Sequence, residues 1–131
     1  RLGRDPGRLR LLTARARLVS KAILTAILGL AFSWHPSPAS LGVQSSEFHL
    51  VLSRPAVKSG RVEIELQNDG EDVHDLRLRR IGGSRTYRVP NTKPGGRRMI
   101  EVALLPGRYR LWCSVADHRQ LGMQAVLRVK R

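Results

Sequence analysis

Hydrophobic and polar residues alternate along most of the chain after residue 44. Alternation with a period of two is typical of β-strands that bury one face, because successive side chains point to opposite sides. The segments between these runs are rich in Gly, Pro, Asn and Asp, which favour turns. No helical period is found in this part of the sequence. The clearest alternating runs are residues 47–52, 61–67, 74–79, 100–104, 108–113 and 124–130.

The number and spacing of these runs predict the fold class. Six or seven short strands separated by turn signals indicate an all-β domain, an antiparallel sandwich or barrel. A chain of 131 residues is long enough for one domain with its own core and too short for two. We therefore expect a single domain over residues 44–130. Residues 82–98 are the least regular, and we expect them to form a long surface crossing.

The first forty residues have a different composition. Residues 1–40 contain seven Arg or Lys residues and one acid, Asp5, and an apolar run extends from Ala22 to Phe32. Proline and small residues follow over 36–40, an order that is typical of a secretory signal. The apolar run is shorter than the ~20 residues that cross a bilayer comfortably. We expect residues 1–40 to be a signal peptide or an N-terminal membrane-anchor helix with a linker; a buried helix is the alternative. The domain would then be exported: periplasmic, extracellular or membrane-anchored facing outward.

The net charge of +14 does not arise from the N-terminal segment alone. Residues 41–131 contain seventeen Arg or Lys and nine acidic residues, mixed along the predicted strands. This composition fits a solvated surface, or attraction to an acidic partner or an anionic membrane surface. The sequence shows no recognition-helix motif, zinc spacing or aromatic RNA platform, so we expect no binding to nucleic acid.

The candidate chemistry lies near the C-terminus. Cys113 is the only cysteine, so no intrachain disulfide can form. His118 and Met123 follow it with the spacing Cys-x4-His-x4-Met, on a loop between two predicted strands. About forty residues earlier, His74 follows the turn Asn68-Asp-Gly and enters another strand. The alternation places His74 with Leu76 and Leu78, and Cys113 with Tyr109 and Leu111, so both point into the predicted core.

Two imidazoles, one thiolate and one thioether are the ligand set of a type 1 copper site. Zinc usually takes four strong ligands, and methionine is a weak one. Iron–sulfur clusters need more cysteines. Each residue alone has a simpler interpretation: buried Cys113 as a small core hydrophobe, Met123 as core filler, His118 as a loop histidine, and His74 as a hydrogen-bonded core histidine. Their occurrence together favours one copper ion, cycling between Cu(I) and Cu(II), bound by all four.

The two remaining histidines are not expected to be ligands. His49 lies on the polar face of its predicted strand, with Glu47 and Val51. His35 belongs to the N-terminal segment, which a signal peptidase would remove.

At these residues the sequence resembles the cupredoxins, which include plastocyanin, azurin and small bacterial cupredoxin-like proteins. The resemblance covers most of residues 44–130 and is carried by Asn68-x5-His74, by the Leu-Pro-Gly-x-Tyr-x3-Cys run over 105–113, and by the loop over 113–123. It implies a Greek-key β-sandwich of about six to eight strands, with copper at one end and with His118 near the surface as the exit for the electron. It also implies that hydrogen bonds near Cys113 tune the reduction potential.

The sequence departs from the family pattern beside both histidines. Asp75 stands where Asn is frequent, and Ala116 and Asp117 stand where Pro and Gly often precede the second histidine. A carboxylate beside each histidine would lower the potential, hydrogen-bond a ring nitrogen or loosen the loop.

These features together predict an electron carrier rather than an enzyme. One copper would exchange single electrons with a redox protein partner, which the basic surface suggests is acidic, and the N-terminal segment would allow membrane association. Two alternatives stay open: an exported copper carrier or sink, and a cupredoxin-fold interaction module without a redox role.

Overall fold

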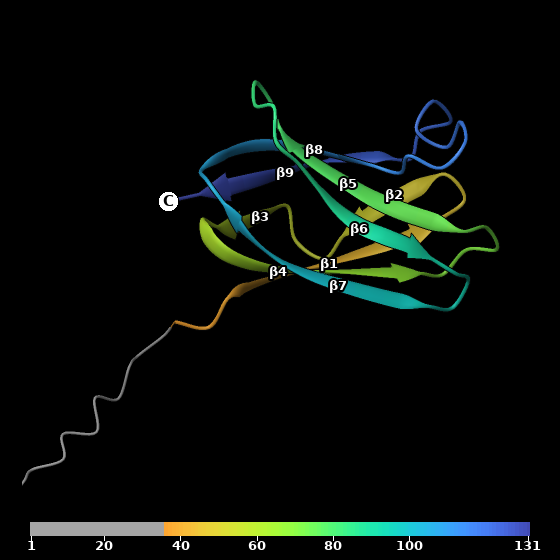
Figure 1. Ribbon diagram of the computed structural model, residues 1–131, viewed down its shortest axis with the longest axis horizontal. Helices are drawn as coiled ribbons and strands as arrows, with labels where there is room; N and C mark the ends of the chain where they lie inside the picture. Colours follow the sequence, from red (N-terminus) through yellow and green to blue (C-terminus); the bar gives the residue numbers. More distant parts are fainter. Residues whose placement is uncertain (1–35) are drawn as a thin grey trace, which may run out of the picture. The chain divides into compact units, whose positions relative to one another are not determined.

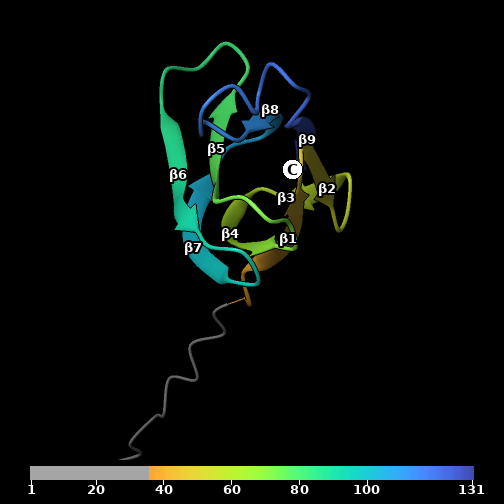
Figure 2. The same cartoon turned by 90° about the vertical axis from the view of Figure 1, so that its right-hand side faces the viewer.

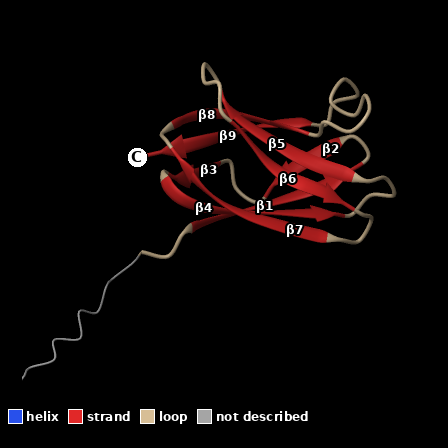
Figure 3. Cartoon of the chain, in the orientation of Figure 1, coloured by secondary structure: helices blue, strands red, loops and turns tan. Residues whose placement is uncertain are grey.

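The computed structural model describes residues 36–131, which form nine β-strands (Figure 1). These residues form strands and loops only, with no helix in that part of the chain (Figure 3). The all-β fold class predicted from the alternation is therefore confirmed. The strands are β1 (Ala39–Ser46), β2 (His49–Leu52), β3 (Ala56–Lys58), β4 (Gly60–Asn68), β5 (His74–Arg80), β6 (Thr86–Thr92), β7 (Arg97–Leu104), β8 (Gly107–Trp112) and β9 (Gln124–Lys130).

The strands form two sheets that pack as a sandwich. The four-stranded sheet has the order β2-β1-β4-β7, and the five-stranded sheet has the order β3-β9-β8-β5-β6. The chain changes sheet five times, before and after β3, between β4 and β5, between β6 and β7, and between β7 and β8. Connections of this kind are found in Greek-key sandwiches. Most neighbouring strands are antiparallel. Two pairs, β1 with β4 and β3 with β9, are parallel, which the expectation of an antiparallel sandwich did not include.

The core lies between the two sheets and is built from the alternating positions. In β4, for example, Val62, Ile64 and Leu66 are fully buried, while the residues between them are more exposed. Burying one such side chain stabilises the fold by roughly 1.5–3 kcal/mol. The buried core cluster comprises Leu41, Val43, Val57, Val62, Ile64, Leu66, Leu76, Leu78, Val89, Leu104, Tyr109, Leu111, Leu127 and Val129.

The region expected to be a surface crossing contains a strand. β6 pairs antiparallel with β5 and forms one edge of the five-stranded sheet. Its alternation is irregular, because only Val89 and Thr92 are buried and the register with β5 shifts between His74 and Leu76. Pro90 lies within this strand, and proline is tolerated at a sheet edge, where its missing N–H leaves no neighbour unpaired.

The first strand, β1, begins at Ala39, upstream of the alternating runs seen in the sequence. Leu41 and Val43 of β1 are each 1% exposed and belong to the core. Gly42 separates them, and Ser40 and Gln44 flank them, so only two large apolar residues signalled this strand. With β1, β6 and the three-residue β3, the strand count exceeds the six to eight that we expected.

The predicted signal or anchor lies almost entirely outside the described residues, and the division of the chain at residue 40 stays a prediction. None of the described residues belongs to a helix that could traverse a bilayer.

Three of the connections at one end of the sandwich, away from the C-terminus, surround the candidate ligands (Figure 1). They are the β1–β2 turn, the β4–β5 loop and the β8–β9 loop, and Figure 2 looks onto this end. The candidate ligands lie on the last two of these connections or at their borders.

Candidate metal centre

Strand geometry places two candidate ligands inside the sandwich. His74 is the first residue of β5, and its side chain points inward with those of Leu76 and Leu78. Cys113 directly follows β8 and continues the inward face of Tyr109 and Leu111. Both residues are 0% exposed, which confirms the orientation predicted from the alternation.

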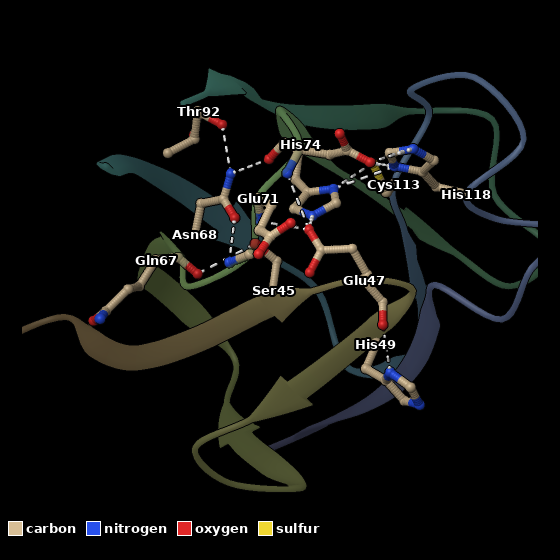
Figure 4. A network of polar contacts seen from close by, with 12 residues as sticks. Ser45, Glu47, His49, Gln67, Asn68, Glu71, His74, Thr92, Cys113 and His118 are labelled. Carbon is tan, nitrogen blue, oxygen red and sulfur yellow. Dashed lines mark hydrogen bonds and ion pairs between the residues drawn. The ribbon is translucent and has the colours of Figure 1, made fainter. Parts of the chain in front are cut away.

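The side chains of His74, Cys113 and His118 converge on one point (Figure 4). The two Nδ1 atoms are 3.2 Å apart, and the Cys113 sulfur lies 3.9 Å from Nδ1 of His74 and 3.8 Å from Nδ1 of His118. The point equidistant from these three atoms is about 2.1 Å from each, within the range of about 2.0–2.3 Å for nitrogen and sulfur bonds to zinc, a comparable metal. The three side chains could therefore hold one metal ion together, and two imidazoles with one cysteine sulfur are the strong donors of a His2Cys copper site.

The loop over 113–123 holds its candidate ligands through its own backbone. The N–H of Cys113 donates to the carbonyl of Met123 at 3.1 Å, and the N–H of Met123 donates to the carbonyl of His118 at 2.9 Å. Gly122 adopts a φ of 114°, which a residue with a Cβ rarely accepts. Met123 is 0% exposed. Its burial agrees with the prediction that it is a ligand, but the thioether as fourth ligand stays a prediction.

Comparison with known proteins gives a fold but no sequence family. No family model matches the chain, and no curated protein matches it. Auracyanin A, a "blue" copper protein from the green thermophilic photosynthetic bacterium Chloroflexus aurantiacus, superposes with a TM-score of 0.57 at 17% identity, over 72% of this chain and 100% of auracyanin. A purple cupredoxin from Nitrosopumilus maritimus superposes with a TM-score of 0.50 at 18% identity, over 70% and 99% of the two chains. The chain has the cupredoxin fold.

The cupredoxin fold also occurs within larger proteins. A multicopper oxidase matches 73% of this chain with a TM-score of 0.56 at 14% identity, but the match covers only 45% of the oxidase. The fold therefore agrees with the Greek-key sandwich implied by the sequence resemblance. It does not by itself separate a carrier from part of an enzyme.

Asn68 fixes the conformation of the β4–β5 loop, which leads to His74. It is the last inward residue of β4 and is 0% exposed. Its side-chain amide donates to the carbonyls of Asp72 and Thr92 at 2.7 and 2.9 Å, and its side-chain oxygen accepts from the N–H of Gly70 at 3.0 Å. All of the polar atoms of this buried amide are thus used to shape the turn. The Asn-x5-His spacing seen in the sequence has this structural basis.

Asp75 does not act on a histidine ring, which was one role considered for it. Its carboxylate accepts from the N–H and the hydroxyl of Ser114 at 2.6 and 2.7 Å, and from Nε of Arg77 at 2.9 Å. Burial raises the pKa of Asp75, but these hydrogen bonds outweigh it and lower the pKa below its usual value. An ionised Asp75 therefore ties the residue after His74 to the residue after Cys113.

Two site residues were missed by the sequence interpretation. Glu47 and Phe48 lie in the β1–β2 turn. The Glu47 carboxylate approaches His74 Nε2 at 3.6 Å, and the Phe48 ring meets the His118 ring edge-on, with centroids 5.2 Å apart. Their contacts join segments more than twenty residues apart, so spacing along the sequence gives no signal for them. His49, excluded as a ligand, is exposed and contacts the Glu47 carbonyl at 2.9 Å.

Burial favours the neutral forms of the His74 ring and the Cys113 thiol. Burial lowers the pKa of His74, and the nearby His118 lowers it further. Burial also raises the pKa of the Cys113 thiol. A metal cation reverses this balance, because it displaces the thiol proton and pairs with the thiolate. His74, Cys113 and His118 thus fit a copper ion in donor type, spacing and protonation chemistry.

Proposed function

We propose that this domain binds one copper ion through His74, Cys113, His118 and Met123 and carries single electrons between redox partners. The observation that carries the proposal is the triangle of two Nδ1 atoms and one sulfur, whose centre is at bonding distance from all three. Bound copper would supply a one-electron couple, with sulfur favouring Cu(I) and imidazole accepting both oxidation states.

The residues of the domain supply rigidity, exclusion of water and a route to the surface. His74 and Cys113 are 0% exposed, and the hydrogen bonds of Asn68, Asp75 and Met123 hold the ligand-bearing segments in place. A site that is already shaped needs little rearrangement when the charge of the ion changes. His118 is 6% exposed and is the ligand of this cluster that reaches solvent. Its ring is therefore our candidate for the point where electrons enter and leave.

The role of carrier, rather than enzyme, rests on what electron transfer requires. An outer-sphere transfer needs one shielded metal and a nearby docking surface, and it needs neither a substrate pocket nor a general base. Residues 36–131 supply one cluster of the required kind. The observed fold also serves oxidases, so the assignment as a carrier is our proposal and needs a test of its own.

The decisive experiment is a titration of the purified domain with Cu(II), followed by visible spectroscopy. We expect one copper per chain and an intense blue, green or purple thiolate band. Cys113→Ser should abolish the band, and Met123→Leu should keep it while raising the reduction potential, because the weak thioether donor is lost. A pale spectrum typical of nitrogen and oxygen ligands would falsify the proposed site. Weak Cu(II) binding with tight Cu(I) binding would instead support copper delivery or storage.

We also propose that the domain works outside the cytoplasm with an acidic redox partner. The basic and apolar order of residues 1–32 supports export, which fractionation of cells that express the whole chain tests directly. The five-stranded sheet supports an acidic partner, since its five strands contain a single carboxylate, Asp75. Its outer side carries a set that we name the arginine face: Arg79, Arg88, Arg108, Arg110 and Arg128, all exposed.

A further inference from the structure

The two nitrogens of the His74 ring have separate surroundings. Nδ1 faces Cys113 and His118, whereas Nε2 points toward the β1–β2 turn (Figure 4). Among the described residues, Nε2 of His74 is the buried side-chain polar atom that lacks a hydrogen bond. Its nearest charged neighbour is Oε1 of Glu47 at 3.6 Å, somewhat beyond the 2.7–3.2 Å of a hydrogen bond.

The Glu47 carboxylate is held where it is by the loop that leads to His74. Its Oε1 accepts from the backbone N–H groups of Glu71 and Asp72 at 2.6 and 3.0 Å. These backbone bonds, that of Asp72 first, lower the pKa of Glu47 to about 2. The side chain is 36% exposed, yet the carboxylate is fixed and ionised beside a histidine that is fully buried.

Gly70 makes room for this carboxylate. A Cβ built on Gly70 would overlap the Glu47 carboxyl group and lie 2.9 Å from its Cδ. Gly70 is not one of the glycines with a positive φ, so its backbone does not require glycine. Space for Glu47 is therefore what the missing side chain provides. The β1–β2 turn and the β4–β5 loop therefore pack together around the Glu47 carboxylate.

We propose that Glu47 accepts a hydrogen bond from Nε2 of His74, and that it thereby orients His74 toward copper and favours Cu(II) over Cu(I). The inference rests on the proposed copper site. A metal on Nδ1 leaves the ring proton on Nε2, which becomes a hydrogen-bond donor aimed at Oε1. A carboxylate that accepts this bond fixes the tautomer and makes the ring a stronger ligand. Its negative charge also stabilises the more highly charged ion.

The first test compares Glu47→Gln with Asp72→Asn. Glutamine keeps an oxygen for the N–H groups of Glu71 and Asp72, so the fold is preserved while the charge is lost. Asp72 is a matched control, because its Oδ2 lies 3.9 Å from Nε2 of His118 but its side chain is 59% exposed. We expect E47Q to weaken Cu(II) binding about 10- to 100-fold relative to Cu(I). A tenfold loss of Cu(II) affinity relative to Cu(I) corresponds to a rise in the reduction potential of about 59 mV. D72N should change the ratio of Cu(II) to Cu(I) affinity much less, because water screens the exposed Asp72 carboxylate.

The second test displaces the carboxylate without removing its charge. Gly70→Ala should displace the Glu47 carboxylate from His74. It should therefore raise the reduction potential, as E47Q does. In a Glu47→Ala background there is no carboxylate to displace, so adding G70A should have no further effect on the potential. Additive effects of the two substitutions, or equal effects of E47Q and D72N, would overturn the inference.

A zinc-loaded sample gives a readout that does not depend on copper chemistry. With Zn(II) as the probe, nitrogen NMR should show His74 metallated at Nδ1 with a slowly exchanging Nε2 proton. E47Q should accelerate the exchange of that proton, and D72N should not. If copper gives no thiolate band, the proposed function fails, while this measurement still decides whether Glu47 partners His74. An unchanged exchange rate of the Nε2 proton in E47Q would contradict the role inferred for Glu47, without contradicting the proposed function.

Discussion

Asp75 connects the two strands that supply the buried ligands. It follows His74 in β5, and its carboxylate accepts two hydrogen bonds from Ser114, the residue after Cys113. Arg77 provides a third donor, and Asp75 is only 1% exposed. A buried carboxylate with three donors is a strong contact between strands, because each bond involves a charged group in a poorly solvated place.

Asp75→Asn should therefore destabilise the domain by about 2–3 kcal/mol, since the new amide N–H₂ group would face the hydroxyl of Ser114 and Nε of Arg77. Urea unfolding of both proteins measures the difference. Asp117→Asn is the matched control, because Asp117 is exposed on the ligand loop and its substitution should change stability by less than about 0.5 kcal/mol. Equal losses of unfolding free energy in the two variants would show that the hydrogen bonds of Asp75 do not stabilise the domain.

Local sequence patterns identify some residues of the site and not others. The residue types, their loop spacing and the period-two pattern were sufficient to select His74, Cys113 and His118. Asp75 was noticed as unusual, but its role depends on Ser114, which lies 39 positions later. Glu47 gave no signal, because its position beside His74 follows from how the β1–β2 turn meets the β4–β5 loop. Contacts between distant segments are decided by packing, which local patterns do not encode.

At the level of elements, Tyr109 stabilises the passage of the chain from one sheet to the other. β7 belongs to the four-stranded sheet and β8 to the five-stranded sheet. Tyr109 of β8 is 2% exposed, and its hydroxyl donates to the carbonyl of Leu105, in the connection, at 3.0 Å. A tyrosine that bonds back to the chain a few residues upstream is a known feature of corners in Greek-key sandwiches.

The buried phenol gives stability a dependence on alkaline pH. Burial raises the pKa of Tyr109 above its usual value near 10. The contribution of the neutral phenol is complete below pH ~10 and is lost as pH rises through the higher pKa of the folded state, because the unfolded chain releases its proton first. Tyr109→Phe should cost about 1 kcal/mol at neutral pH. Urea unfolding from pH 7 to 11 should show this difference shrinking above pH ~10. A difference that stays constant with pH would contradict the argument.

Strands were predicted well where both faces of the alternation are clear. β4, β5, β8 and β9 were located within one or two residues, because their inward positions are large and apolar and their outward positions are mostly charged. β1 was missed because Gly42 and several serines dilute its pattern, and β6 because Pro90 and its place at a sheet edge weaken it. Strand order, and the two parallel pairings, arise from the closure of the whole sandwich and had no local signal.

At the scale of the whole domain, charge is divided unequally between the two sheets. The four-stranded sheet mixes signs, as in the Arg61–Glu101 ion pair. On the five-stranded sheet, by contrast, neighbouring strands place arginines side by side: Arg79 is paired with Arg110, and Arg108 with Arg128. Arg79 and Arg119 also lie over the Trp112 ring, at 5.7 and 5.0 Å from its centroid. Trp112 directly precedes Cys113, so the part of the arginine face around Arg79 adjoins the candidate metal centre.

This arrangement predicts that the location of charge, and not only the net charge, controls electron transfer with anions. We expect Arg79→Glu/Arg110→Glu to slow oxidation of the Cu(I) protein by hexacyanoferrate(III), a trianion, by at least about tenfold at low salt. Arg54→Glu/Arg97→Glu is the matched control, since it changes the charge equally at exposed sites outside the five-stranded sheet. The rates come from stopped-flow absorbance of the thiolate band.

The effect of the arginine substitutions should fade at high salt, because screening shortens the reach of surface charges to a few ångströms. A cationic oxidant such as tris(phenanthroline)cobalt(III) should react faster with the first variant than with the unaltered protein. If both variants slow the anion equally, the arginine face is an ordinary solvated surface and gives no preference for an acidic partner.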